Sequence, residues 1–180
     1  GEARVILATA SSQLSFIEAL QEEDVPWDRV VVFHMDEYAG IGDRHQASFG
    51  RWLREHVAEP LGARIECIAG DSADIAGECE RYEALLREKA IDLVCLGIGG
   101  DGHLAFNEPG VADFDDARWV RPVELSRAYR EQQVEGGFFA ELGEAPSLAI
   151  SLTIPALLSG RDTQVVVPGS QKAAAIRATL

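Results

Sequence analysis

Apolar residues along the chain follow two alternating patterns. Short runs rich in β-branched residues, mostly apolar on both faces, predict strands of a parallel sheet covered by helices: Arg4–Ala8, Arg29–His34, Ile91–Leu96, Leu148–Leu152 and Gln164–Val167. Weaker strand candidates are Arg64–Ile68 and Trp119–Val123. Between these runs, helical spacing of apolar residues predicts the helices Leu14–Glu23, Ser48–Val57, Ala73–Lys89, Ser126–Ala140, Ile154–Leu158 and Gln171–Thr179.

The alternation of strands and helices predicts the class of fold. It favours an α/β protein with an open, mostly parallel sheet that is flanked by helices on both faces, Rossmann-like, with right-handed crossovers. The length of 180 residues fits a single domain over residues 1–180. In such sheets ligands bind beyond the carboxyl ends of the strands. A site is therefore expected in the loops that follow strands.

The net charge and the cysteines limit which binding partners and which cellular compartment are expected for this chain. Thirty acidic residues against 16 basic ones give a net charge of −14. So acidic a surface repels nucleic-acid phosphates and anionic membranes, and neither is expected as a partner. The three cysteines form no CxxC pair, which argues against a disulfide framework or structural zinc and favours a reducing cytoplasm. No signal-like segment begins the chain, and only Lys89 and Lys172 are lysines.

Two loops after predicted strands contain groups suited to binding or catalysis. Residues 9–13, Thr-Ala-Ser-Ser-Gln, bring hydroxyls and backbone N–H groups to a predicted helix N-terminus. These groups suit an anion such as a sugar phosphate, or simply cap the helix. Asp36 and Glu37 follow an apolar strand. A carboxylate in a partly desolvated cleft has a raised pKa and can act as a general base on carbon, whereas the alternative is a solvated turn.

A glycine-rich loop at residues 97–102 matches the pattern GxGxxG. A dinucleotide site is disfavoured, because Pro109 interrupts any helix begun there and Asp101 would face a pyrophosphate. The same loop continues to His103 and Glu108, and a histidine oriented by carboxylates is a general acid–base. The alternative is a surface turn with one hydrogen-bonded histidine. The other histidines belong to different predicted elements and indicate no metal site.

The last of these loops combines glycine, a hydroxyl and a lysine. Pro168-Gly169-Ser170-Gln171-Lys172 follows the last predicted strand and opens the last predicted helix. Such groups at a helix start suit a phosphate, although this is not a P-loop, since the upstream GxxxxG is missing. An exposed charge at a helix end is the alternative. The placing of one of the two lysines here favours phosphate binding.

Three motifs, in their order and spacing over about the whole chain, resemble those of the glucosamine-6-phosphate deaminase (isomerase) family, within a wider group that includes 6-phosphogluconolactonases. They are Met35-Asp36-Glu37-Tyr38, the segment from Gly97 to Pro109, and Gly169-Ser170-Gln171-Lys172. Lactonases share the Asp-Gly-His of the second motif but continue differently. The continuation Phe-Asn-Glu-Pro at residues 106–109 is deaminase-like. The resemblance implies a fold of the sugar-phosphate isomerase type.

The resemblance also implies a role for each matching residue. Asp36 would remove the proton from C2 of the open-chain sugar and return it to C1. His103 would open the ring by moving a proton between O1 and O5, oriented by Asp101 and Glu108. This route converts glucosamine 6-phosphate to fructose 6-phosphate and ammonia, and it needs no metal and no redox cofactor. Substrate contacts are implied for Thr9, Ser11, Ser12, Glu37, Gly99, Gly100 and Lys172, of which Lys172 and the two serines would hold the 6-phosphate.

The chain departs from the family pattern in three respects. Ala10 stands in a phosphate loop that is usually glycine-rich, and the loss of glycine limits how closely the backbone approaches a phosphate. Gln132 or Gln133 stands where regulated members carry a phosphate-binding arginine, with Arg127 and Arg130 nearby as substitutes. Members of the family normally extend further at both ends, so that this single domain is shortened relative to them.

The sequence leaves other functions open. Lactone hydrolysis would use His103 on a water molecule and would not need Asp36 as a base on carbon. A sugar-phosphate sensor domain would need only the phosphate loops, and usually carries a DNA-binding helix-turn-helix, for which the sequence offers no basic recognition helix. The acidic segment 111–116 predicts that no effector phosphate binds there. A homo-oligomer is left open.

Overall fold

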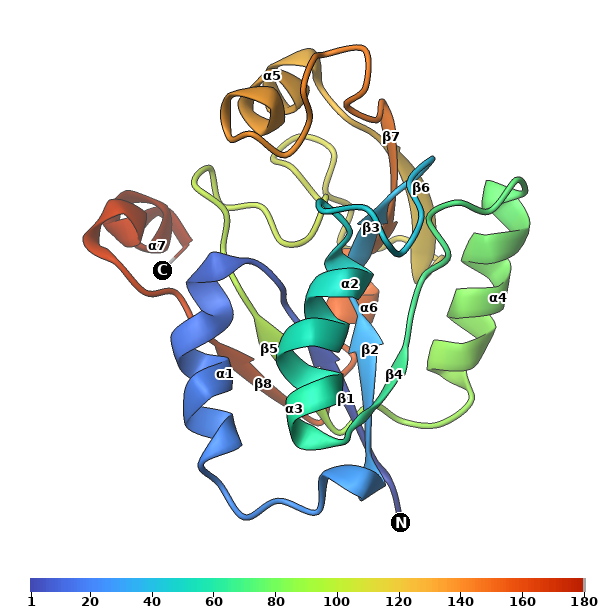
Figure 1. Ribbon diagram of the computed structural model, residues 1–180, viewed down its shortest axis with the longest axis vertical. Helices are drawn as coiled ribbons and strands as arrows, with labels where there is room; N and C mark the ends of the chain where they lie inside the picture. The colour runs from blue at the N-terminus through green and yellow to red at the C-terminus, as the bar shows by residue number, and fades with distance from the viewer. Residues whose placement is uncertain (180) are drawn as a thin grey trace.

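The computed structural model describes residues 1–179 and contains a five-stranded parallel sheet. Its strands are β1 (Ala3–Leu7), β2 (Val30–His34), β4 (Arg64–Glu66), β5 (Leu93–Leu96) and β8 (Asp162–Val165). They lie in the order β4-β2-β1-β5-β8, and every neighbouring pair is parallel (Figure 1). The predicted α/β class with an open parallel sheet is confirmed. Because the chain builds outwards in both directions from β1, the strand order reverses between β1 and β5.

A second, antiparallel sheet corrects part of the strand prediction. It contains β3 (Asp36–Tyr38), β7 (Leu148–Leu152) and β6 (Val120–Glu124) in the order β3-β7-β6. The prediction that 148–152 is a parallel strand was wrong. The segment is buried along most of its length, and its apolar run therefore resembles that of a parallel strand. The strand β3 was not predicted at all; it follows β2 after a single residue and pairs Asp36 with Ser151.

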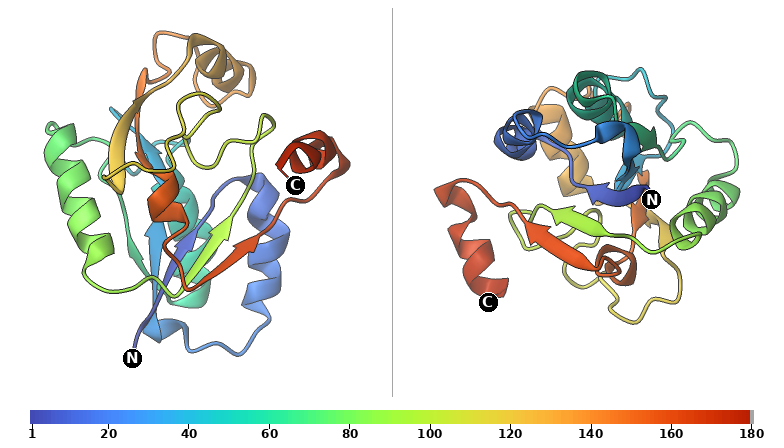
Figure 2. Two further views of the ribbon diagram at one scale, coloured as in Figure 1. Left: turned by 180° about the vertical axis from the view of Figure 1, so that it is seen from behind. Right: turned by 90° about the horizontal axis from the view of Figure 1, so that it is seen from below.

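Helices cover both faces of the parallel sheet, and each face has its own core. On one face lie α1 (Leu14–Gln21) and a continuous helix made of α2 (Phe49–Leu53), a π-helical turn (Arg54–Ala58) and α3 (Glu59–Leu61). On the other lie α4 (Ile75–Arg87) and α6 (Ile154–Leu157), which also pack against the second sheet. Figure 2 shows α1 and α2 on the side of the parallel strands opposite to α6.

Two further helices stand at the end of the molecule where the strands β1, β5 and β8 finish (Figure 1). The helix α5 (Arg127–Glu135) begins at Ser126, whose hydroxyl accepts a hydrogen bond from the N–H of Tyr129. It is shorter than the predicted 126–140, because Gly137 has a positive φ of 76° that ends the helical path. The helix α7 (Ala173–Thr179) follows the 3-10 turn Ser170–Lys172.

Three other observations bear on the predictions. All four residues of β8 are exposed, whereas the apolar run at 164–167 predicted a strand covered on both faces. Cys67, Cys79 and Cys95 carry free thiols. Within residues 1–179, none of the helices is both long enough and apolar enough to cross a membrane.

Candidate active site

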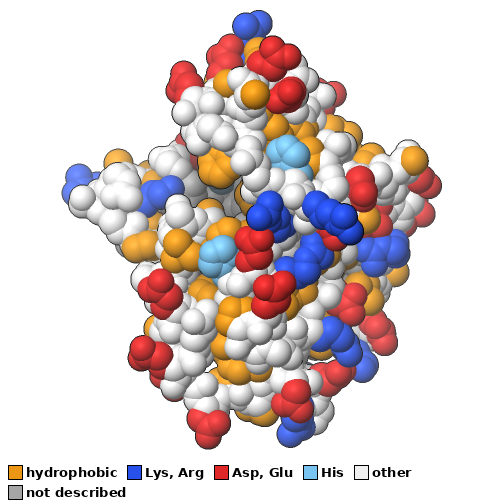
Figure 3. Space-filling view, viewed as in Figure 1, with side chains coloured by type: hydrophobic (Ala, Val, Ile, Leu, Met, Phe, Trp, Pro, Cys, Tyr) orange, Lys and Arg blue, Asp and Glu red, His pale blue; other side chains and the backbone are white. Residues whose placement is uncertain are grey.

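A cavity of about 370 Å³ opens where the strand order reverses, beyond the carboxyl ends of β1 and β5. This is the position at which open parallel sheets bind their ligands. Its walls come from the loops after β1, β2, β5 and β8 and from α5 and the loop that follows it. In Figure 3 the surface is hollowed between the lobe that holds α5 and the projecting α7. The lining includes the predicted site residues Thr9, Ser11, Ser12, Asp36, Gly99, His103 and Lys172.

Asp36 is the first residue of β3, and it lines the cavity as a half-buried carboxylate. Its place is fixed by the backbone pairing of β3 with β7, opposite Ser151. Burial removes the carboxyl group from water and, together with the negative charge of Glu37, raises the pKa of Asp36 to about 7. A carboxylate of this kind is a base poised to exchange a proton near neutral pH.

His103 lines the same cavity from the glycine-rich loop after β5. Its Nδ1 is 2.6 Å from Oδ1 of Asp101, which also accepts a hydrogen bond from the backbone N–H of His103. Burial alone would raise the pKa of Asp101, but these two bonds hold it below its usual value. A Cβ atom at Gly99 would overlap the imidazole ring, so that only glycine leaves room for His103 there. Gly100 and Asp101 stand on the exposed outer side of the loop.

Glu108 lies outside the cavity lining, although it follows His103 closely along the chain. Among the described residues, its carboxylate makes neither a hydrogen bond nor an ion pair with His103, and Asp101 alone orients the imidazole. Its charge acts elsewhere: together with Asp36 it opposes ionisation of the Tyr129 hydroxyl. The predicted role of Glu108 in tuning the histidine therefore stays a prediction.

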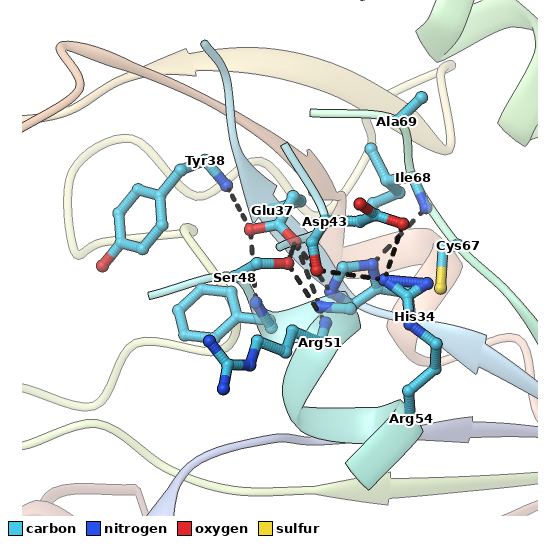
Figure 4. A network of polar contacts seen from close by, with 12 residues as sticks. His34, Glu37, Tyr38, Asp43, Ser48, Arg51, Arg54, Cys67, Ile68 and Ala69 are labelled. Atoms are coloured by element: carbon cyan, nitrogen blue, oxygen red, sulfur yellow. Dashed lines mark hydrogen bonds and ion pairs between the residues drawn. The ribbon is translucent and has the colours of Figure 1, made fainter. Parts of the chain in front are cut away.

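Glu37 lies outside the lining of this cavity, and its side chain points toward Ser48 (Figure 4). It is 2% exposed, and its carboxylate accepts hydrogen bonds from the Ser48 hydroxyl at 2.6 Å and from backbone N–H groups at Tyr38, Phe49 and Gly50. Burial raises the pKa of Glu37, while these bonds favour its charged form. Glu37 therefore holds the start of α2 against β3, and this geometry offers no contact with a ligand in the cavity that Asp36 lines.

The two predicted phosphate loops have the same backbone form. In the first, Ala10 has φ 95° and ψ 163° and precedes the 3-10 turn Ser11–Gln13 that leads into α1. In the second, Gly169 has φ 95° and ψ 139° and precedes the turn Ser170–Lys172 that leads into α7. The loss of glycine at position 10 has thus not changed the path of the chain. Alanine there holds a backbone conformation that glycine normally occupies.

Gln13 connects three strand ends, and sequence reasoning missed it. The residue is 1% exposed, and its side-chain amide donates hydrogen bonds to the Val166 carbonyl at 3.1 Å and the Ser12 hydroxyl at 3.4 Å. A Cβ atom at Gly97 would lie 3.1 Å from the same amide nitrogen. Gln13 therefore fixes the loop after β1 relative to the ends of β5 and β8. No signal in the sequence pointed to such a role, because Gln13 stands among the polar residues Ser11, Ser12 and Ser15.

Helix α5 supplies a wall of the cavity; sequence reasoning named Gln132 or Gln133 at a family phosphate position but missed Tyr129. Tyr129 and Gln133 lie one helical turn apart and line the cavity, and Tyr38 joins them from β3. The two arginines of this helix do not enter the cavity. Arg127 pairs with Glu131 on the surface, and Arg130 donates hydrogen bonds to backbone carbonyls of the following loop.

No three side chains of His, Cys, Asp or Glu within residues 1–179 come together in a way that could hold a metal ion. The cavity contains two ionisable side chains, Asp36 and His103, with a lysine and two helix starts beside them. The fold and the site together define an α/β protein whose cavity at the strand ends brings two groups able to move protons beside a lysine.

The chain belongs to the family of glucosamine-6-phosphate isomerases and 6-phosphogluconolactonase, whose family model matches residues 1–180. The resemblance inferred from the motifs is thereby confirmed. A glucosamine-6-phosphate deaminase from Exiguobacterium sibiricum is 34% identical over 172 residues, which make up 95% of this chain and 66% of that protein. One from Streptococcus suis is 33% identical over 175 residues, which make up 97% of this chain and 73% of that protein.

Solved structures agree with the sequence relatives. A monomeric glucosamine-6-phosphate deaminase superposes with a TM-score of 0.85 at 26% identity, over 98% of this chain and 75% of the other. A 6-phosphogluconolactonase from Shewanella baltica superposes with a TM-score of 0.77 at 19% identity, over 100% and 73%. The second likeness concerns the fold alone. This chain thus spans about two thirds to three quarters of the length of these proteins.

Proposed function

We propose that this chain catalyses the deamination of glucosamine 6-phosphate, in which the sugar phosphate and water give fructose 6-phosphate and ammonia. The observation that carries the proposal is that Asp36, a carboxylate with a pKa near 7, shares one cavity with His103 and Lys172. An aldose–ketose conversion of this kind needs a base that removes a proton from carbon, a group that opens the ring and a group that binds the phosphate. The deaminase relatives support the choice of an amino sugar.

Asp36 is the base on carbon in this proposal. Its ionised form takes the proton from C2 of the open-chain sugar, and the protonated carboxyl group then returns the proton to C1. A second proton passes from the nitrogen to O1, which leaves a C=N bond at C2 and a hydroxyl at C1. The raised pKa suits both halves of the step, because a group that titrates near the working pH both accepts and donates readily. Water hydrolyses the resulting ketimine at C2, and the C–N bond breaks with release of ammonia.

His103 opens the sugar ring. With the proton on Nδ1 directed to Asp101, the Nε2 atom keeps a free lone pair for a sugar hydroxyl. It takes the proton from O1 and delivers it to O5 as the ring bond breaks. Asp101 keeps this tautomer and stabilises the imidazolium that forms on the way.

The phosphate end of the substrate lies between the two helix starts. Lys172 supplies a full positive charge, and Ser11 and Ser12 supply hydroxyl and backbone N–H donors. These local donors matter because the protein as a whole carries a charge of −14 and repels an anion at long range. We further propose that the reaction takes place in the cytoplasm, which the free thiols of the chain support.

The test is release of ammonia and fructose 6-phosphate from glucosamine 6-phosphate. Asp36→Asn and His103→Gln should each lower kcat by about 10²-fold or more, the usual contribution of a general acid or base. Asp24→Asn on the exposed surface is the matched control and should behave as the wild type. Activity that survives in both site variants would refute the mechanism. A second assay uses 6-phosphogluconolactone as the substrate. Its hydrolysis needs no base on carbon, so this activity should survive Asp36→Asn if the chain is a lactonase.

A further inference from the structure

A tight turn at residues 104–107 directly follows His103 and ends its loop. The backbone N–H and the side-chain amide of Asn107 both donate hydrogen bonds to the Leu104 carbonyl, at 3.0 and 2.9 Å. Ala105 within this turn has a left-handed φ of 49°, and it lines the same cavity as His103. The turn is therefore closed on itself, so that the position of His103 depends on what the turn is attached to.

Two buried side chains attach this turn to β7. The hydroxyl of Ser151 accepts a hydrogen bond from the backbone N–H of Phe106 at 3.1 Å and donates one to the Leu152 carbonyl at 3.0 Å. The side-chain amide of Asn107 donates to the same carbonyl at 2.8 Å. Ser151 is 0% exposed and Asn107 is 2% exposed. Because these groups are shielded from water, the loss of one bond leaves a buried polar group without its partner.

The same two residues of β7 also hold the segment that carries Asp36. Ser151 is the register partner of Asp36, and the backbone N–H of Leu152 donates to the Met35 carbonyl at 2.9 Å. Asp36 and His103 both line the cavity, but they belong to segments that follow different strands, β2 and β5. Ser151 and Leu152 are thus one point to which both segments are attached.

We propose that Ser151 and Asn107 are positioning residues that fix the place of His103 relative to Asp36. The inference rests on the proposed function, in which one bound sugar has its ring opened by His103 and its proton moved by Asp36. A displacement of about 1 Å in one of two such groups costs catalysis heavily. Neither Ser151 nor Asn107 belongs to the lining of the cavity, so both act through the turn that they hold and not by touching the substrate.

Two inhibitors test this placement without depending on which step limits the rate. The alditol of glucosamine 6-phosphate, reduced at C1, cannot close its ring and keeps the hydroxyls on C1 and C5 that His103 contacts in the proposed reaction. Inorganic phosphate occupies only the phosphate end of the cavity. In Ser151→Ala the inhibition constant of the alditol should rise roughly 10-fold, as expected for one misplaced hydrogen-bond partner, and that of phosphate should stay within about twofold. The kcat/KM for glucosamine 6-phosphate should fall by about 10-fold or more.

Three further variants separate positioning from stability. Ser151→Thr keeps the hydroxyl and should restore kcat/KM and the inhibition constant of the alditol. Asn107→Leu keeps roughly the size of the side chain and removes only its donors, because the Oδ1 atom is buried without a hydrogen-bond partner within residues 1–179. It should show the same selective loss as Ser151→Ala.

The third variant, Thr153→Ala, is the matched control. Thr153 follows β7 directly and is 1% exposed, and its hydroxyl donates a hydrogen bond to the Arg118 carbonyl at 2.7 Å. The variant therefore loses a buried hydroxyl of the same kind that does not hold the turn. Urea denaturation should show a lower stability for Thr153→Ala and for Ser151→Ala, but both inhibition constants and kcat/KM should stay as in the wild type only in Thr153→Ala.

The outcomes separate the two proposals. An unchanged inhibition constant of the alditol in Ser151→Ala or in Asn107→Leu overturns the positioning role of that residue. An equal rise for the alditol and for phosphate overturns it as well, and so does the same rise in Thr153→Ala, because the loss then follows stability alone. A wild type that neither deaminates glucosamine 6-phosphate nor binds the alditol means that the proposed function itself has failed. An active wild type with a selective loss in Ser151→Ala and Asn107→Leu supports both proposals.

Discussion

Ala10→Gly should make the protein more stable, which is the reverse of what glycine does at most positions. Ala10 has φ 95° and ψ 163°, in a region that essentially only glycine adopts. Holding a residue with a Cβ atom there costs about 1–3 kcal/mol. The greater freedom of glycine in the unfolded chain offsets about 0.4–1 kcal/mol of the gain. The free energy of unfolding should therefore rise on the order of 1 kcal/mol.

Urea denaturation of the wild type and the variant measures this difference directly. The matched variant is Gly169→Ala, which places a Cβ atom in a loop with the same φ and should lower the free energy of unfolding by about 1 kcal/mol or more. Because Ala10 also lines the cavity, its replacement lets the backbone approach a phosphate more closely, and the KM for the sugar phosphate should fall. A less stable Ala10→Gly protein would show that the loop is not strained and would refute the reasoning.

Three further predictions follow from the site. Because the pKa of Asp36 is raised from 3.8 to about 7, kcat/KM should fall below about pH 7. The native state binds this proton more tightly than the unfolded state, so the free energy of unfolding should decrease as the pH rises from 3.8 to about 7. Asp36→Asn should remove this decrease from a profile of stability against pH measured by denaturation. Gly99→Ala should displace the imidazole of His103 and lower kcat by about 10-fold or more in the deaminase assay, with a small change in Tm. Gln13→Leu should leave the Val166 carbonyl without its donor, and urea denaturation should show a free energy of unfolding lower by about 1–3 kcal/mol. The KM for the sugar phosphate should rise, and an unchanged KM would mean that Gln13 does not position the loops.

Periodicity in the sequence located most strands but could not assign them to sheets. The segment Leu148–Leu152 is buried between other elements, and burial leaves the same apolar pattern whether a strand runs parallel or antiparallel to its neighbours. The strand Asp36–Tyr38 shows no strand pattern in the sequence, because it has only three residues and two of them are acidic. It is a strand only because its backbone pairs with β7, a contact that depends on residues far away along the chain.

The candidate site was predictable where it depends on topology and was missed where it depends on side-chain partners. Loops that follow parallel strands meet at one edge of the sheet, so Asp36, His103 and Lys172 could be placed together from the sequence alone. Nothing in the pattern around Tyr129 or Gln133 shows that a tyrosine of β3 joins them. The same holds for Glu37, for which the resemblance implied a substrate contact, although adjacent residues of a strand face opposite sides.

The cavity brings together two groups of side chains that differ in charge, as the proposed substrate requires. Lys172 and the starts of two helices, ahead of α1 and α7, supply positive charge and N–H donors, while Asp36 on β3 supplies a carboxylate. Glucosamine 6-phosphate has its phosphate on C6 and its amine on C2, so that its own charges are separated in the same sense. A net charge of −14 repels the phosphate and attracts an ammonium ion. Orientation of the substrate therefore depends on the local donors around Lys172, without which the negative protein would favour the amine alone.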